Sequence, residues 1–310
     1  MKKKIAVTAP YLQFEWEKYK HLLSDYEIVI PPVFERFEEA DMLRILTPDI
    51  EGIICGDDRI TEKVIDNASN LRVIVKWGTG IDSINRKYAG SKGIPVRNTP
   101  DAFITPVTES TIGLMLSIVR RIDENNRKMH EGKWEKLRAF TLFELTIGII
   151  GYGRIGSAVA RKLSAFSENV IWYDIKTDEE LNPKGEFYGK RVTLPELLER
   201  ADIISVHCDL NPTSRHLISE ENIIRMKDGV ILINTARGSV LNEPDVEKYL
   251  KTGKIGFAGL DVFEKEPLPQ DSFLRSCDRC ILLSHNTNSS PLHWERVHLN
   301  SIKMLKEYLT

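Results

Sequence analysis

Short runs rich in valine and isoleucine recur along the chain and alternate with segments of helical spacing. In the first hundred residues these runs are KIAVTA from Lys4, EIVI from Glu27, GIICG from Gly52 and VIVKWG from Val73. Strands separated by helix-length segments pair in parallel through right-handed crossovers. We therefore expect the first hundred residues to form one small α/β domain.

A second series of such runs fills the rest of the chain. It consists of TIGIIG ending at Gly151, VIWYD ending at Asp174, DIISVHC from Asp202, GVILINTA from Gly229, IGFAGLDV from Ile255 and CILLSH from Cys280. These runs are apolar throughout rather than alternating, as is typical of strands that helices cover on both faces. They predict a six-stranded doubly wound sheet, and 310 residues suffice for two domains.

Two helical segments connect these sheets. Residues 106–130 predict one long connecting helix, because polar residues at its start precede helical apolar spacing. Pro291–Leu309 carries apolar residues at helical spacing, which predicts an amphipathic helix that returns to the first domain; they are Val297, Leu299, Ile302, Leu305 and Leu309. The polar stretch 176–190 predicts a surface loop. His293 and His298 stand five residues apart, a spacing that does not align a metal pair, so we expect surface roles.

Composition narrows the class of function. A net charge of -2 exerts no long-range attraction on nucleic acid, and no stretch approaches the ~20 apolar residues of a membrane span. Four cysteines are too few for a disulfide framework in a chain of this length, which favours a reducing, cytoplasmic location. Cys277 and Cys280 form a CxxC without a second pair of ligands, so we expect no metal.

The first chemical motif is a glycine turn after an apolar strand. Gly151, Gly153 and Gly156 form GxGxxG and lead into the helical stretch SAVARKL. The first glycine permits a tight turn, the second lets the backbone approach a pyrophosphate, and the third lets helix and strand pack closely. The helix N-terminus favours the anion, and Arg154 adds a charge beside it. The motif predicts a dinucleotide site.

Asp174 is in register with this motif, eighteen residues after Gly156 and at the end of the next strand. A carboxylate there accepts from the ribose hydroxyls and repels a 2′-phosphate, which favours NAD over NADP.

A second turn, Gly78-Thr79-Gly80-Ile81, follows the strand from Val73 and lacks a third glycine in phase. We expect its backbone N–H groups to form a nest for a carboxylate or for the nicotinamide end.

Three chemically suitable side chains stand at the ends of the later strands. Arg237 follows GVILINTA, Glu266 follows FAGLDVFEK and His285 ends CILLSH. Oxidation or reduction at the α-carbon of a 2-hydroxy acid needs a cation for the carboxylate, an acid/base for the hydroxyl proton and a group that tunes this base. Ligands of open α/β sheets bind beyond the carboxyl ends of the strands, so separate segments can converge there.

Several motifs in order now carry a family resemblance. They are KWGTGIDSIN, GIPVRNTP, the glycine turn, SVHCDLNPTSRHLIS, NTARGSVLNE, GLDVFEKEP and SHNTNSSP. Together they resemble the D-isomer-specific 2-hydroxyacid dehydrogenase family along the whole chain, most nearly its D-3-phosphoglycerate dehydrogenases. This resemblance implies an NAD-dependent enzyme in which Arg237 binds the substrate, His285 is the acid/base and Glu266 raises the pKa of His285.

The resemblance also implies a fold of two Rossmann-like or flavodoxin-like doubly wound parallel-sheet domains with a cleft between them. Residues 1–100 plus 287–310 would form the substrate domain and 101–286 the NAD-binding domain. The implied cofactor contacts are Thr79, Gly151, Gly153, Arg154, Ile155, Gly156, Asp174, His207, Cys208, Thr235, Ala236 and Asp261, the last with the carboxamide. The implied substrate contacts are Gly56, Thr79, Gly80, Ile81 and Arg237. Members usually form homodimers through the NAD-binding domain, so we expect an interface over residues 103–134.

Departures from the family pattern keep the substrate open. Ser284 stands where many relatives have proline, and Gly56-Asp57-Asp58 occupies a turn where the phosphoglycerate enzymes commonly carry an arginine, which Arg59 could replace. A glyoxylate or hydroxypyruvate reductase is the alternative, and an NAD-sensing binding protein resembling the C-terminal-binding corepressors is another. Formate-type relatives carry glutamine where this chain has Glu266, which favours a hydroxy acid. With the sequence ending at Thr310, we expect no control through a C-terminal effector domain.

Overall fold

A computed structural model describes residues 2–182 and 185–310 and divides the chain into two compact units. Unit 1 comprises residues 1–103 and 289–310, and unit 2 comprises residues 104–288. These divisions stand a few residues from the domain boundaries that the sequence suggested at 100 and 286. Residues 183 and 184, within the expected loop 176–190, lie outside the described residues.

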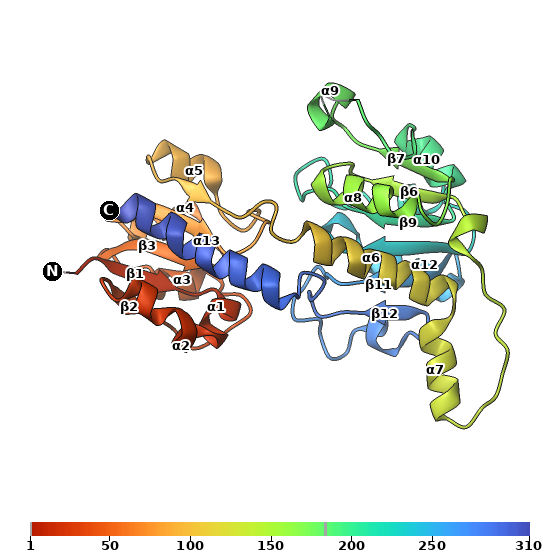
Figure 1. The fold of residues 1–310 in the computed structure, drawn as a ribbon, viewed down its shortest axis with the longest axis horizontal. Helices are drawn as coiled ribbons and strands as arrows, with labels where there is room; N and C mark the ends of the chain where they lie inside the picture. The colour runs from red at the N-terminus through yellow and green to blue at the C-terminus, as the bar shows by residue number, and fades with distance from the viewer. Residues whose placement is uncertain (1, 183–184) are drawn as a thin grey trace. The chain divides into compact units, whose positions relative to one another are not determined.

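Unit 1 is built on a five-stranded parallel sheet in the order β2-β1-β3-β4-β5 (Figure 1). The strands are β1 Lys4–Val7, β2 Glu27–Val29, β3 Ile50–Cys55, β4 Val73–Lys76 and β5 Val96–Arg97. Four of them are the strands that the apolar runs predicted. The fifth, β5, was not predicted, because two residues are too short to show a periodic pattern. The helices are α1 Pro10–Phe14, α2 Trp16–Tyr19, η1 Lys20–Leu23, α3 Glu39–Ile45, α4 Glu62–Asn67, α5 Arg86–Ser91 and α13 Pro291–Leu309.

The C-terminal helix α13 packs on the sheet of unit 1, as its amphipathic pattern predicted. A Cβ built on Gly52 of β3 would lie 2.9 Å from Leu305 and 3.0 Å from Leu309, so the helix lies directly over this strand. Leu299 is exposed, whereas His298 is fully buried and its Nδ1 accepts from Trp77 Nε1 at 2.9 Å. The expected surface role of His298 is therefore wrong, because the indole donor gives its ring a partner inside the core.

Unit 2 contains a seven-stranded parallel sheet in the order β12-β11-β10-β9-β6-β7-β8. The strands are β6 Ile147–Ile150, β7 Val170–Tyr173, β8 Lys190–Arg191, β9 Ile203–Val206, β10 Val230–Asn234, β11 Ile255–Leu260 and β12 Cys280–Leu282. The prediction of six strands was one short. The additional strand β8 begins where the expected surface loop ends, and both of its residues are exposed and charged, so it has no apolar signature.

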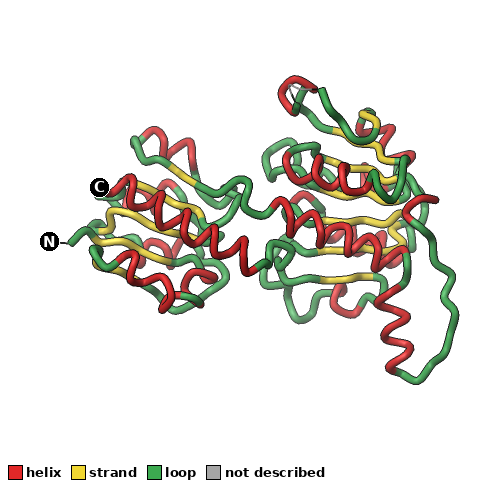
Figure 2. The backbone as a smooth tube through the Cα atoms, viewed as in Figure 1, coloured by secondary structure: helices red, strands yellow, loops and turns green. Residues whose placement is uncertain are grey.

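Helices cover both faces of this sheet, as the tube in Figure 2 shows. They are α6 Ile104–Val119, α7 Ile122–His130, η2 Leu142–Glu144, α8 Arg154–Leu163, α9 Asp178–Leu181, α10 Leu194–Arg200, α11 Glu220–Ile223, η3 Gly238–Val240, α12 Glu243–Thr252 and η4 Phe273–Ser276. The single connecting helix that was predicted is two helices, α6 and α7. The chain breaks at Arg121, which has a left-handed φ of 55°, and α7 buries none of its residues whereas α6 buries nine.

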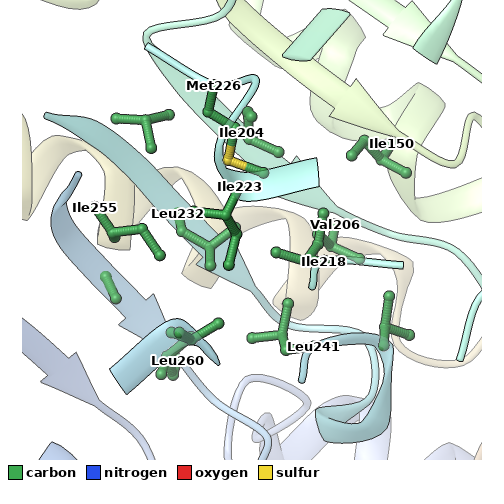
Figure 3. Packing of buried hydrophobic residues seen from close by; sticks show 14 of the residues in the cluster. Ile150, Ile204, Val206, Ile218, Ile223, Met226, Leu232, Leu241, Ile255 and Leu260 are labelled. Carbon is green, nitrogen blue, oxygen red and sulfur yellow. The ribbon is translucent and has the colours of Figure 1, made fainter. Parts of the chain in front are cut away.

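The core of unit 2 explains why its strands are apolar at consecutive positions. Ile204 and Leu232 pack with α10 and α12 on one face (Figure 3), whereas their neighbours Ile203 and Ile233 pack with α6 and α8 on the other. Complete burial of such a side chain contributes roughly 1.5–3 kcal/mol, so both faces stabilise the sheet. In the described part of the chain, no helix is both long and apolar enough to cross a membrane.

Candidate active site

The glycine turn between β6 and α8 has three glycines with three different local requirements. Gly151 has a φ of +91°, and a Cβ there would lie 2.6 Å from the backbone nitrogen of Cys208. A Cβ on Gly156 would lie 1.9 Å from the carbonyl oxygen of Gly151. A Cβ on Gly153 would meet no described atom within 4 Å. Packing inside the protein therefore accounts for the first and third glycines, whereas the second borders open space that a ligand can approach.

The start of α8 fits an anion in that space. Gly153 is its N-cap residue and has no side chain to cap the helix, so the first turn of α8 keeps the donor character of a helix N-terminus. This first turn, the open side of Gly153 and the helix dipole suit the pyrophosphate of a dinucleotide.

Asp174 lies against this turn. Its Oδ2 accepts from the backbone N–H of Tyr152 at 2.7 Å, and its Oδ1 accepts from the N–H of Lys176 at 2.9 Å. The partly exposed carboxylate is thereby held at the glycine turn, and each oxygen keeps a further lone pair for a ribose hydroxyl. The structure thus brings together the glycines and the acid that the sequence spacing associated.

His207 and Cys208 follow β9 and pack behind Gly151. Burial lowers the pKa of His207 to about 3 and raises the pKa of Cys208 to about 12, so both side chains are uncharged at neutral pH. The Nε2 of His207 contacts Ser205 Oγ at 2.8 Å, and its buried Nδ1 has no hydrogen-bond partner among the described residues. An uncharged imidazole and an uncharged thiol are suited to packing against the face of a nucleotide base.

The turn after β10 carries Thr235, Ala236 and Arg237. The Oγ1 of Thr235 lies 2.9 Å from the Oγ1 of Thr111 on α6. Fully buried Asn234 closes the turn: its Oδ1 accepts from the N–H of Ala236 at 3.0 Å, and its Nδ2 donates to the carbonyl of Arg237 at 2.9 Å. The sequence interpretation missed Asn234, although a polar residue at the end of an apolar strand was the available signal.

Glu266 and His285 form the central pair of the site. Their contact joins His285 Nδ1 and Glu266 Oε2 at 2.9 Å, and both side chains are about one-fifth exposed, at 22% and 23%. The other carboxylate oxygen, Oε1, accepts from the N–H of Phe263 at 2.9 Å, so the orientation of Glu266 is fixed from two sides. His285 has a left-handed φ of 54°, an unusual conformation that its surroundings must enforce.

Hydrogen bonds to Asp261 hold the backbone of His285 in this conformation. Its carbonyl accepts from the N–H of His285 at 2.8 Å, and its fully buried carboxylate accepts from the N–H of Asn286 at 2.7 Å and from Thr287 Oγ1 at 2.5 Å. The side chain therefore fastens the segment that carries His285. Its expected contact with a nicotinamide carboxamide stays a prediction.

Gly238 joins the segments of Arg237 and Glu266. A Cβ on Gly238 would lie 1.9 Å from the carbonyl carbon of Phe263 and 2.4 Å from the nitrogen of Glu264, so the two backbones are in direct contact. The structure thus brings Arg237, Glu266 and His285 onto three neighbouring, mutually fastened segments at the carboxyl ends of β10, β11 and β12.

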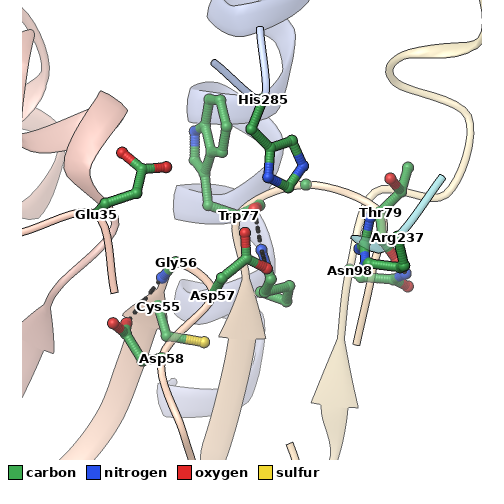
Figure 4. Close-up of polar contacts among 12 residues, drawn as sticks. Glu35, Cys55, Gly56, Asp57, Asp58, Trp77, Thr79, Asn98, Arg237 and His285 are labelled. Carbon is green, nitrogen blue, oxygen red and sulfur yellow. Dashed lines mark hydrogen bonds and ion pairs between the residues drawn. The ribbon is translucent and has the colours of Figure 1, made fainter. Parts of the chain in front are cut away.

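In unit 1 the turn after β3 contains Gly56, Asp57 and Asp58. The carboxylate of Asp58 turns back to accept from the N–H of Gly56 at 2.9 Å (Figure 4), and it also accepts from Thr8 Oγ1 at 2.5 Å and Phe37 N at 2.9 Å. Burial raises the pKa of Asp58. Asp58 therefore holds this end of the sheet together.

A buried lysine stands beside this turn. The ammonium of Lys76, at the end of β4, lies 3.2 Å from Asp57 Oδ1 and donates to the carbonyl of Trp77 at 2.9 Å. A Cβ on Gly78 would lie 3.7 Å from the same nitrogen. Arg59, proposed as a replacement cation, pairs instead with Glu38 at 3.8 Å on an exposed surface. The positive charge near the Gly78 turn is thus already matched by a carboxylate.

Residues that follow β5 form hydrogen bonds to the turn that starts at Gly78. Gly78 has a φ of +112°, its carbonyl accepts from Thr99 N at 3.0 Å, and the carbonyl of Thr79 accepts from Asn98 Nδ2 at 2.6 Å. Thr79, Gly80 and Ile81 are partly exposed. With its carbonyls engaged by the protein, this turn can offer N–H groups to an anion.

The cysteines of the CxxC lie at the start of β12. Cys277 and Cys280 are free and partly buried, and the N–H of Cys280 donates to the carbonyl of Cys277 at 2.9 Å. Burial raises the pKa of the Cys280 thiol, and its neighbour Cys277 adds to the shift. Across the described ranges, no three side chains of the metal-binding types gather into a site.

Comparison with known proteins identifies relatives of both units. Residues 112–287 match the family model described as "D-isomer specific 2-hydroxyacid dehydrogenase, NAD binding domain". The chain is 36% identical over 88% of its length to a hydroxypyruvate reductase of Thermotoga maritima, covering 89% of that protein. It is 37% identical over 83% of its length to a D-3-phosphoglycerate dehydrogenase of Methanocaldococcus jannaschii, of which it spans about half, 48%. The crystal structure of an Aquifex aeolicus D-lactate dehydrogenase complexed with NAD and lactic acid aligns over 99% of this chain and 95% of its own, with a TM-score of 0.87 and 30% identity.

Proposed function

Because the chain belongs to the D-isomer-specific 2-hydroxyacid dehydrogenase family and is an NAD-dependent oxidoreductase, we propose that it interconverts a small, unphosphorylated 2-keto acid and its D-2-hydroxy acid. Unit 2 would bind NAD at the glycine turn and Asp174, and unit 1 would bind the substrate at the turns after β3 and β4. The observation that carries this proposal is the fixed His285–Glu266 pair.

The protein's own residues divide the chemistry among them. Bound NADH would supply the reducing equivalent. Arg237 would pair its planar guanidinium with the carboxylate and carbonyl oxygens of the keto acid. Glu266 holds Nδ1 of His285, so the proton delivered to the substrate oxygen is assigned to Nε2, and the adjacent carboxylate stabilises the imidazolium that delivers it.

The open side of Gly153 and the two carboxylate oxygens of Asp174 support the proposed cofactor contacts. Thr235, Ala236, His207 and Cys208 lie at the ends of β10 and β9 in the same sheet. A 2′-phosphate would meet the Asp174 carboxylate, which supports the preference for NAD over NADP.

The substrate proposal rests on charges in unit 1. The phosphoglycerate enzymes that the sequence most resembled act on a phosphorylated acid, which requires unpaired positive charge. Here Asp57 already pairs with Lys76, Asp58 is an additional buried carboxylate, and Arg59 is engaged elsewhere. Like charges placed together disfavour binding, so an uncharged far end, as in hydroxypyruvate or glyoxylate, fits this turn better than a phosphate.

A keto-acid panel tests the proposal. Consumption of NADH is followed by absorbance with hydroxypyruvate, glyoxylate, pyruvate and 3-phosphohydroxypyruvate, for the wild type and His285→Ala. We expect hydroxypyruvate or glyoxylate to give the highest kcat/KM, and His285→Ala to lower kcat by about a thousandfold while NADH still binds. Tight NADH binding without reduction of any keto acid would establish the binding-protein alternative instead.

We also propose a homodimer that forms through unit 2, in the cytoplasm. Residues 103–134 expose large apolar side chains, among them Ile122 at 55%, Met129 at 48% and Trp134 at 84%. Burying such groups against a second copy is favourable. Sedimentation of the wild type and of Trp134→Glu tests this: we expect a dimer that the substitution weakens, and a monomeric wild type would contradict it.

A further inference from the structure

His216 lies at the junction of the segments that carry Arg237 and Glu266. Its backbone N–H donates to the carbonyl of Ser239 at 2.9 Å, two residues after Arg237. The pairing continues along the chain, because Ile218 N donates to the carbonyl of Val240 at 3.1 Å. The backbone of His216 is therefore fastened to the turn that presents the arginine.

The side chain of His216 reaches the other segment. Its Nε2 lies 2.5 Å from Oε1 of Glu264, and the side chains are 39% and 28% exposed. Glu264 stands two residues before Glu266, on the loop whose Phe263 N–H also holds the Glu266 carboxylate. One residue thus contacts both segments, by its backbone on one side and by its imidazole on the other.

Two further contacts close the same junction. The Cβ position of Gly238 touches the backbone of Phe263 and Glu264, and Glu264 N donates to Glu243 Oε2 at 3.0 Å. Burial and the neighbouring Glu264, Glu247 and Glu266 raise the pKa of Glu243, so carboxylates crowd this region. The imidazole of His216 gives the Glu264 carboxylate a hydrogen-bond partner in this acidic region.

The backbone of His216 shows that the side chain matters there. His216 has a left-handed φ of 53°, a conformation that costs energy for residues other than glycine. Glycine would adopt it without that cost and would keep the backbone bond to Ser239. A histidine in this conformation is uncommon, and here its ring also has a defined partner in Glu264.

We propose that His216 is a positioning residue that, with Glu264, sets the spacing between Arg237 and the Glu266–His285 pair. The inference rests on the proposed function, because it gives His216 a role in the reaction that those three residues perform. The imidazole contributes by holding the Glu264 loop against the arginine turn, without contacting substrate.

The test uses His216→Gly, which keeps the left-handed backbone and removes only the ring, together with Glu264→Gln and the double variant. Arg225→Gln is the matched control, since it breaks an exposed ion pair of unit 2, with Glu199 at 3.0 Å, away from this junction. Measured are kcat/KM for the keto acid that the wild type reduces, the NADH dissociation constant, and hydrogen exchange of the Phe263 amide.

We expect His216→Gly to lower kcat/KM about tenfold, less than the hundredfold that a misplacement of 1 Å can cost, with NADH affinity changed less than about twofold. The Phe263 amide should exchange about tenfold faster, since its acceptor lies on the loosened loop. The double variant should be no worse than the more damaged single variant, because both substitutions remove one contact.

Unchanged kcat/KM and unchanged Phe263 exchange in His216→Gly would overturn the inference, as would additive losses in the double variant or an equal loss in Arg225→Gln. If the wild type reduces no keto acid at all, the proposed function fails by itself. Faster exchange at Phe263 in His216→Gly would then still show the junction, but the positioning role in catalysis would be refuted along with the reaction.

Discussion

In unit 1, the charged side chains in the turns after the parallel strands are paired with other groups of unit 1. In unit 2, the corresponding turns carry Arg237 and His285, and hydrogen bonds from neighbouring buried residues fix the backbone of these turns. The carboxylate of Asp58 accepts hydrogen bonds from three donors of the protein, and Lys76 forms an ion pair with Asp57. In unit 2, Asn234 binds the backbone of its own turn, and Asp261 binds the backbone and a threonine of the neighbouring loop after β12; Arg237 and His285 lie on these two segments. The comparison teaches that the carboxyl ends of two parallel sheets can form either a structural brace or a candidate reactive site, depending on which residues receive the hydrogen bonds.

Among the substitutions that compare the two units, Arg237→Lys in unit 2 should have the largest effect. Lysine keeps the charge but loses the planar fork, so we expect kcat/KM for the keto acid to fall about a hundredfold. The control Lys76→Arg in unit 1 makes the opposite exchange at a charge that is already paired, and we expect a much smaller loss. Steady-state kinetics check both variants, and near-normal turnover of Arg237→Lys would remove the guanidinium from the reaction.

Two substitutions in the glycine turn should separate an effect on stability from an effect on NADH binding. Gly156→Ala places a methyl group 1.9 Å from a carbonyl oxygen, so we expect the free energy of unfolding to fall by about 1–3 kcal/mol. Gly153→Ala meets open space and should leave stability within about 0.5 kcal/mol, yet weaken NADH roughly thirtyfold, or ~2 kcal/mol. Denaturant unfolding and NADH titration measure the two quantities. Tight NADH binding by Gly153→Ala would place the pyrophosphate elsewhere.

Asp174→Ala should have a smaller effect that depends on the cofactor. It removes the proposed ribose acceptor and the bonds to Tyr152 N and Lys176 N, and we expect about tenfold weaker NADH binding. NADPH should lose less, because the repulsion of its 2′-phosphate disappears with the carboxylate. Titration with both cofactors decides this, and equal losses would mean that the carboxylate only supports the turn.

Asp57→Asn should have the smallest effect and probes the charge balance of unit 1. With Lys76 no longer neutralised, kcat/KM for 3-phosphohydroxypyruvate should rise about fivefold relative to hydroxypyruvate, the ~1 kcal/mol expected of a partly exposed charge. The ratio of the two rates is the measurement. A ratio that stays constant would show that the far end of the substrate does not approach this turn.

The sequence predicted the elements with a strong apolar signature. The four strands predicted for unit 1, the six predicted for unit 2 and α13 are all present, whereas β5 and β8, with two residues each, left no pattern. The break between α6 and α7 depends on one left-handed residue, Arg121, which no periodicity reveals. His298 was misassigned because its partner, Trp77, lies 221 residues away in sequence.

In the candidate site, too, some contacts could be predicted from the sequence and others could not. The spacing of the glycine turn and Asp174 predicted their meeting, because a strand and the next strand of a parallel sheet end at one edge. Family motifs suggested the Glu266–His285 contact. A polar residue at the end of an apolar strand could have marked Asn234, but the hydrogen bonds of Asp261 and His216 could not be predicted, since they depend on the conformation of three loops relative to one another.

The most direct test of the Glu266–His285 pair is the pH profile of keto-acid reduction in the wild type and Glu266→Gln. Reduction consumes a proton from the imidazolium, so the rate must fall as pH rises and the ring loses that proton. Because a carboxylate 2.9 Å from the ring favours the imidazolium, removing its charge should move the alkaline limb of kcat/KM to lower pH. An alkaline limb at the same pH in both proteins would contradict the assignment of this pair as the proton donor.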